Sequence, residues 1–181
     1  MDPVLEKLQG AIASAISGLS PELLRWHPEG KWCTAEVLEH LYLTYTGTTK
    51  GFQRVAEAGK SLATSPTWAD RGKALLVTGL GYFPPGRKAP PSARPRGIAS
   101  EKVLAEILEK IAEMDKAIRQ CEEKLGARQR LLDHPVLGPL NTREWRKFHL
   151  VHGLHHAKQI RRLRASAASE KQSTKRIERR A

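Results

Sequence analysis

Apolar residues recur every three or four positions along most of this chain, and that period is typical of helices with one face buried in a core. In the stretch after Ser100, for example, apolar side chains form one stripe and charged side chains the opposite face. Start signals such as Asp2-Pro3 and stop signals such as Gly126 bound these stretches. The pattern predicts helices over residues 3–19, 35–58, 66–79, 100–125 and 142–163.

No stretch shows the alternation of apolar and polar residues that is typical of a half-buried strand, and residues 128–141 are expected to be irregular. Long amphipathic helices with polar connections predict an all-α fold, an antiparallel four-helix bundle. The segment from Phe83 to Pro95 holds five prolines and cannot be helical. It is expected to be an extended Pro-rich loop on the surface, between the third and fourth helices.

The C-terminal tail differs from the rest of the chain. Beyond Ala165 it has one large apolar residue, Ile177, and such a segment buries too little apolar surface to fold by itself. We therefore expect a helical bundle over residues 1–165 and a disordered basic tail over residues 166–181.

The composition is that of one globular domain. The chain has 181 residues, of which 40% are hydrophobic, and this is long enough for a core. No apolar run approaches the roughly 18 residues of a membrane span, and the N-terminus has no secretory signal. Cys33 and Cys121 are far apart and form no CxxC motif, which favours a reducing compartment. These features predict a cytoplasmic protein with no membrane contact.

The net charge of +12 raises the question of nucleic acid binding. Residues 161–181 hold eight Lys/Arg and two Glu, a charge of +6, and residues 84–96 add four basic residues and no acid. The predicted bundle is therefore nearly balanced, and specific nucleic acid binding is not expected. A basic tail is still capable of weak, salt-sensitive contact with an acidic partner.

Four of the seven histidines fall in the last predicted helix: His149, His152, His155 and His156. On a helical wheel, His152, His156 and Gln159 share one face, and His152 and His156 stack one turn apart. Imidazole is the commonest side-chain metal ligand, so this pair provides half of a metal site. Gln159 is expected to orient a ligand or to line a pocket.

His40 is the candidate third ligand, at the flank of the apolar face of the second long helix. Thr44, Gly47 and Gly51 follow it on the same side, and small residues there leave room for a pocket wall. If this helix neighbours the last one, three imidazoles face one another. Three nitrogen ligands with an open fourth position is the geometry of a catalytic zinc site.

His149 is the main rival within the last helix, because it is able to pair with His152 at i,i+3 in place of His156. All three cannot share one ion, because seven residues rise about 10.5 Å. The remaining candidates have structural interpretations: His155 as a helix-flank residue, His27 and His134 as loop residues, Trp145 as core, Glu36 and Glu39 as solvated carboxylates, and Cys33 as a cysteine that nothing places beside an ion.

Three sequence blocks together resemble the DinB-like (YfiT-like) metal-binding superfamily, and the second is similar to its uncharacterised DinB-related branch. The resemblance covers about residues 3–165, and the blocks are Trp32 with Ala35-Glu-Val-Leu-Glu-His40-Leu, His134-Pro-Val-Leu-Gly-Pro-Leu-Asn-Thr-Arg-Glu-Trp145, and His152-Gly-Leu-His-His156-Ala-Lys-Gln159-Ile. The resemblance implies a DinB-like bundle in which His40, His152 and His156 bind a divalent metal ion, zinc or nickel. It also implies a homodimer. Some relatives are S-transferases or isomerases that use a low-molecular-weight thiol, namely bacillithiol, mycothiol or glutathione.

Two functional hypotheses follow. The first is a metal-dependent enzyme, a thiol transferase or a hydrolase, in which the ion activates the nucleophile because no carboxylate is placed as a general base. The second is a non-catalytic bundle, in which the histidines or their ion only stabilise the fold and the basic tail contacts an acidic partner.

Overall fold

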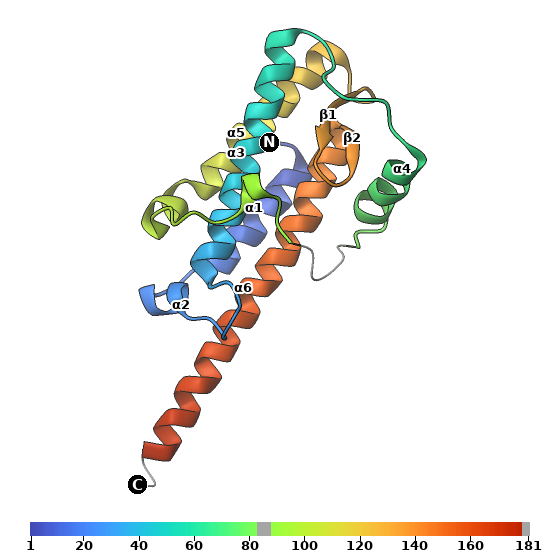
Figure 1. Cartoon of the computed structure of the whole chain (residues 1–181). Helices are drawn as coiled ribbons and strands as arrows, with labels where there is room; N and C mark the ends of the chain where they lie inside the picture. The colour runs from blue at the N-terminus through green and yellow to red at the C-terminus, as the bar shows by residue number, and fades with distance from the viewer. Residues whose placement is uncertain (83–87, 179–181) are drawn as a thin grey trace.

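The computed structural model describes residues 1–82 and 88–178 and shows a mostly helical protein (Figure 1). Four long helices pack together, and a two-stranded hairpin, two short helices, a π-helical turn (Leu75–Gly79) and a 3-10 turn (Pro91–Ala93) surround them. The elements are α1 Pro3–Ile16, α2 Pro21–Arg25, α3 Thr34–Ala58, α4 Trp68–Ala74, α5 Ser100–Leu125, β1 Arg130–His134, β2 Gly138–Asn141 and α6 Thr142–Glu178.

Helices α1 and α6 run in the same direction. Arg146, near the start of α6, has its Nε 3.5 Å from the carboxylate of Asp2, which caps the start of α1. Farther along α6, Arg164 donates a hydrogen bond of 3.0 Å to the carbonyl of Ser17, just after the end of α1. The two helices therefore pass along the bundle as a parallel pair.

Helices α3 and α5 form a second parallel pair. The Tyr42 hydroxyl donates to Glu106, and farther along both helices the Cys121 thiol donates to the carbonyl of Phe52. The prediction of an antiparallel bundle is therefore wrong for these two pairs. The cause is the long connection over residues 59–99, which returns the chain to the end where α3 began before α5 starts.

The core lies between the four long helices and uses the stripes that the sequence pattern predicts. On α5 its members recur every three or four residues and are almost completely buried: Val103, Ile107, Ile111, Met114 and Ile118. Each side chain of this kind contributes about 1.5–3 kcal/mol when it is fully buried.

Residues 130–141 form an antiparallel hairpin, so the prediction that the chain has no strand is wrong. Leu132 lies opposite Leu140, and the turn is closed by the His134 Nδ1, which accepts the backbone N–H groups of Val136 and Leu137, both at 3.1 Å. The strands have five and four residues, one with a proline, so they are too short for a period-2 pattern to be read from the sequence.

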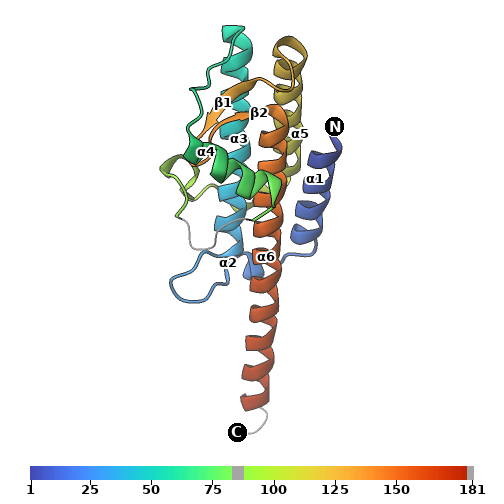
Figure 2. The same cartoon turned by 90° about the vertical axis from the view of Figure 1, so that its right-hand side faces the viewer.

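Helix α6 continues to Glu178, and the prediction of a disordered tail is wrong for residues 166–178. This segment has no proline or glycine and many good helix formers. It is also anchored: Ala167 is buried, the Trp26 indole donates to Glu170 (2.8 Å), and Lys171 pairs with Glu22. Figure 2 shows α6 extending well past the other helices.

Helix α4 and the π-helical turn after it correspond to the predicted third helix, and they lie beside the bundle instead of within it (Figure 1). Trp68, Leu75 and Leu80 on this segment are largely exposed. In the part of the chain that the structure describes, no helix has the length and apolar character needed to cross a membrane.

The close approach of α6 to α1 at Gly153 generates a test. A Cβ atom at this position would overlap the Leu8 side chain, which is completely buried, and would lie 3.3 Å from the Tyr45 hydroxyl. We expect Gly153→Ala to lower the free energy of unfolding by about 1–3 kcal/mol, measured by urea denaturation.

The matched control is Gly10→Ala in α1, where a Cβ atom meets nothing within 4 Å. We expect this change to stabilise the protein by about 0.5–1 kcal/mol, because alanine is the better helix former. Equal effects of the two substitutions would contradict the packing described for Gly153.

Candidate metal centre

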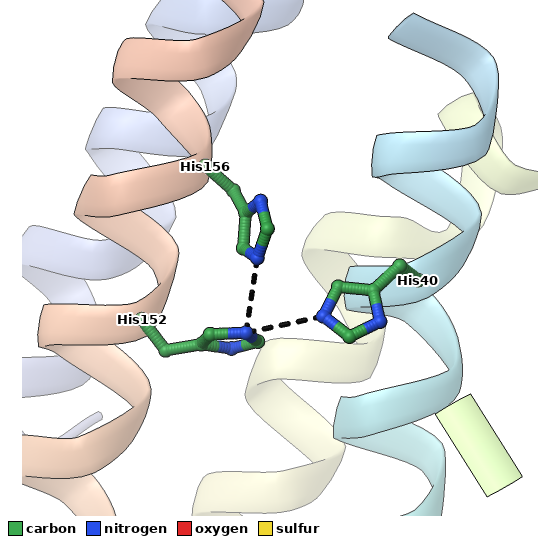
Figure 3. A group of neighbouring side chains, drawn as sticks. All are labelled: His40, His152 and His156. Atoms are coloured by element: carbon green, nitrogen blue, oxygen red, sulfur yellow. Dashed lines mark hydrogen bonds between the residues drawn. The ribbon is translucent and has the colours of Figure 1, made fainter. Parts of the chain in front are cut away.

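The structure brings together the three histidines that the sequence singles out. His40 comes from α3, and His152 and His156 come from successive turns of α6, which runs antiparallel to α3 at this level (Figure 3). The His152 Nε2 lies 3.1 Å from the His40 Nε2 and 3.0 Å from the His156 Nε2. All three side chains are buried.

This spacing fits a single ion. One potential ligand atom from each ring lies within 4.8 Å of the others, and the group contains no carboxylate or thiol. A tetrahedral zinc ion with Zn–N bonds of about 2.0–2.1 Å requires nitrogens about 3.3 Å apart. The separations of 3.1 and 3.0 Å from the His152 Nε2 to the His40 and His156 Nε2 atoms are within a few tenths of an ångström of that value.

Hydrogen bonds to the outer nitrogens orient two of the rings. The Nδ1 of His40 donates to the carbonyl of Ala93 (2.8 Å), and the Nδ1 of His156 donates to the Oε1 of Gln159 (2.9 Å). With the proton fixed on Nδ1, the Nε2 of His40 and the Nε2 of His156 each direct a lone pair into the space between the three rings. Gln159 thus contacts the outer nitrogen of a candidate ligand, and its role at the centre stays a prediction.

The loop segment just after Ala93 is fixed to α3 by a buried carboxylate next to His40. Glu39 is 3% exposed and accepts the backbone N–H groups of Arg96 (2.6 Å) and Gly97 (3.1 Å). The prediction that Glu39 is solvated is wrong. The Pro-rich loop is also more than a surface connection, because its described part, from residue 88 onwards, packs against α3 at the candidate metal centre.

Sequence reasoning missed Ala93 and Glu39 for different reasons. A backbone carbonyl leaves no trace in the residue type, so nothing in the sequence indicates Ala93. Glu39 is an ordinary helix residue by pattern, and its partners lie more than 50 positions away in a loop. The only feature of the sequence that could have drawn attention to Glu39 is its position next to His40, and this is a weak signal.

The three imidazoles are neutral in the folded protein. Burial lowers the pKa of His40, and it lowers the pKa of His152 well below the usual value, with a further contribution from the neighbouring histidines. Burial together with His40 lowers the pKa of His156 to about 3. Neutral imidazole is the form that binds metal, so no proton has to leave these rings near neutral pH.

The rival histidines do not join this group. His149 is completely buried, and its Nε2 bonds to the Thr48 hydroxyl (3.1 Å). His134 closes the hairpin turn, His155 lies on the flank of α6, and His27 is exposed. The alternative pairing of His149 with His152 is therefore not the one that the structure supports.

A cleft of about 2000 Å³ opens beside the three histidines, which form part of its lining. Thr44 and Gly47 also line it, and a Cβ atom at Gly47 would meet nothing within 4 Å. Gly51 differs, because the Leu132 side chain from β1 fills the space beside it. The predicted pocket wall on α3 is thus open at Gly47 and closed by the hairpin at Gly51.

Trp145 and the two cysteines are structural, as their sequence contexts suggest. Trp145 is buried in the core and donates through its indole N–H to the carbonyl of Leu132 (3.2 Å). Cys33 and Cys121 are buried free thiols, and burial raises the pKa of each. Neither cysteine belongs to the histidine group.

The class of protein is thus a helical bundle with a buried three-histidine group that faces a cleft and is able to hold a metal ion. A sequence model of the DinB superfamily matches residues 5–160, which is most of the chain. This protein belongs to the DinB superfamily, as the three sequence blocks predict. Searches of curated proteins and of solved structures gave no match.

Glu39→Gln tests the link between α3 and the loop. The amide NH₂ of glutamine would face a backbone N–H, so one of the two charge-assisted hydrogen bonds is lost. We expect the free energy of unfolding to fall by about 1–3 kcal/mol and the amides of Arg96 and Gly97 to exchange faster with deuterium. Glu57→Gln, in the exposed last turn of α3, is the control. Unchanged exchange at both amides would show that the carboxylate does not hold the loop.

The buried histidines predict a pH dependence for the metal-free protein. Burial lowers the pKa of His134 to about 4 and of His149 to about 3, whereas in the unfolded chain both take up protons below their usual value of 6.5. Stability should therefore be lost as the pH falls from 6.5 towards 4, by about 1.4 kcal/mol per pH unit for each such group.

Urea denaturation across this pH range measures how steeply the free energy of unfolding falls as the pH falls. We expect a smaller slope in His149→Asn and the original slope in His27→Gln, because His27 is exposed. An identical slope in the wild type and in His149→Asn would contradict a neutral, buried His149.

Proposed function

We propose that His40, His152 and His156 hold one divalent metal ion, zinc or nickel, with an open coordination position facing the cleft. One observation carries this proposal: three Nε2 atoms from two helices converge at ligand spacing. The outer hydrogen bonds to Ala93 and Gln159 add support, because such partners are a usual feature of histidines that bind metal.

The function that this centre suits best is that of a metal-dependent enzyme, a thiol transferase or a hydrolase. An ion in the centre supplies Lewis acidity to a water or thiol nucleophile. The nucleophile has to come from outside the protein, because Cys33 and Cys121 are buried with raised pKa values. A low-molecular-weight thiol cosubstrate, which is known for some members of the superfamily, satisfies this requirement.

The three-histidine group itself offers no carboxylate that could deprotonate a nucleophile. The three-histidine group contains no Asp or Glu, and the carboxylate of Glu39 is occupied by two backbone amides. A nucleophile on such an ion would therefore have to lose its proton to a group outside the three-histidine group or to solvent. Gln159 and Ala93 would keep the ligand nitrogens of His156 and His40 in place.

A non-catalytic role is the second candidate, and one observation favours it. The histidines join α3 to α6, so an ion there would cross-link two helices far apart in sequence and stabilise the bundle. A homodimer and a cytoplasmic location remain predictions. For a dimer, the exposed apolar residues of segment 68–82 are the first surface to test.

Metal analysis of untagged protein tests the proposed centre. We expect one zinc or nickel ion per chain, and more than 100-fold weaker binding in His40→Ala, His152→Ala and His156→Ala, because loss of an outer hydrogen-bond partner alone costs about 10–100-fold. His155→Ala, one position away on α6, is the control and should keep its metal. Equal metal content in all four variants would rule out this centre.

Chelation separates the two candidate functions. An enzyme should lose turnover of thiol and electrophile pairs, or of hydrolysable esters, when the metal is removed and regain it when the metal returns. If the metal-loaded protein turns over neither the thiol and electrophile pairs nor the esters, and chelation lowers only its thermal stability, the metal has a structural role.

A further inference from the structure

The indole ring of Trp32 borders the candidate metal centre. Its centroid lies 5.5 Å from the centroid of the His40 ring, and the two ring planes are tilted by 46°. Trp32 belongs to the loop between α2 and α3, is partly buried against the core and lines the cleft. This side chain is therefore a part of the cleft wall that touches a candidate ligand.

The N–H group of this indole is available to a molecule in the cleft. The indole N–H groups of Trp26 and Trp145 have protein acceptors, Glu170 and the carbonyl of Leu132. Among the residues that the structure describes, no acceptor bonds to the Trp32 N–H, and this group is not one of the buried polar atoms that lack a partner. It therefore reaches solvent, and it is free to donate to a ligand.

Gln159 offers a second donor of the same kind. If His156 binds metal through Nε2, its Nδ1 carries the proton, and the Gln159 Oε1 at 2.9 Å accepts it. The NH₂ group at the other end of the amide is left to donate elsewhere. Within the described part of the chain no protein acceptor bonds to this NH₂ group, which is likewise not among the buried atoms without a partner, and Gln159 lines the cleft.

The two donors lie on the same side of the three histidines. Because α3 and α6 run antiparallel at this level, the residues before His40 and the residues after His156 are at the same end of the cleft (Figure 3). Trp32 precedes α3, and Gln159 follows His156 by three residues. Each donor side chain also contacts one of the candidate ligands, so a small molecule at the centre is within reach of both.

We propose that Trp32 and Gln159 determine ligand specificity, by donating hydrogen bonds to carbonyl-type oxygen atoms next to the atom that reaches the metal. The protein itself leaves both donors unused: Glu36 lines the same cleft but accepts the backbone N–H of Cys33 (2.8 Å). The favoured ligand thus carries a carboxylate, ester or amide group a few bonds from its metal-binding atom. This inference rests on the proposed metal centre and deepens it, since it specifies the chemistry of the ligand.

Two thiols of similar shape test the proposal on the metal-loaded protein: 2-mercaptoacetamide, which has a carbonyl oxygen, and 2-methyl-1-propanethiol, which has methyl groups in place of the amide atoms. Titration calorimetry gives the affinity of each thiol for each protein. The two thiols differ in acidity, so the ratio of their affinities is compared between proteins, and the acidity cancels.

Two variants each remove one donor and keep the rest of the side chain's role. Trp32→Phe keeps an aromatic ring against His40 and loses the N–H group, and Gln159→Glu keeps an acceptor for His156 and loses the NH₂ group. Each substitution should lower the preference for 2-mercaptoacetamide over 2-methyl-1-propanethiol by about 3–10-fold, the usual contribution of one neutral hydrogen bond.

Trp68→Phe and Gln172→Glu are the matched controls, because both residues are exposed and lie outside the cleft lining. Both controls should keep the affinity ratio of the wild type. A Trp32→Phe or Gln159→Glu protein that binds both thiols more weakly by the same factor has lost a structural contact only, and this result would overturn the proposal for that residue. An unchanged ratio would overturn it as well.

Metal analysis before any thiol is added separates this inference from the proposed function. All four variants should hold as much metal as the wild type, because His40, His152 and His156 are unchanged. A wild type without metal would overturn the proposed function and this inference together. A metal-loaded wild type whose affinity ratio is the same in both cleft variants would overturn this inference alone.

Discussion

The convergence of three neutral imidazoles between α3 and α6 is the constraint on which this structure depends. His40, His152 and His156 are buried with lowered pKa values, and their inner nitrogens face one another. Buried polar atoms are costly unless they are partnered. A single cation satisfies all three lone pairs at once, which no side chain in the group is able to do. The geometry is therefore compatible with a metal site.

The rest of the fold supports that convergence. Parallel packing of α3 with α5 and of α1 with α6 leaves α3 and α6 antiparallel neighbours, with the histidines at the same level. The connection over residues 59–99 makes this topology feasible and also delivers the carbonyl of Ala93 to His40. Glu39 fixes that part of the loop through two backbone amides. The loop thus has a connecting role and a positioning role.

Much of the fold could be predicted from the sequence, because amphipathic stripes and helix caps are local signals. Such local signals predict the long helices, and they also place His152 and His156 one turn apart. The family blocks add His40. Features that depend on distant partners could not be predicted. The hairpin strands are too short to show a period, and the helical tail is stabilised by contacts with Glu22 and Trp26. The parallel pairs follow from the path of a loop, which no periodicity encodes.

X-ray absorption spectroscopy at the metal edge of the zinc- or nickel-loaded protein tests the central claim most directly. The account predicts three imidazole nitrogens and one exchangeable light atom around a single ion, with the light atom replaced by sulfur when a thiol is added. A first shell with fewer than two imidazoles, or with protein sulfur before any thiol is present, would contradict it.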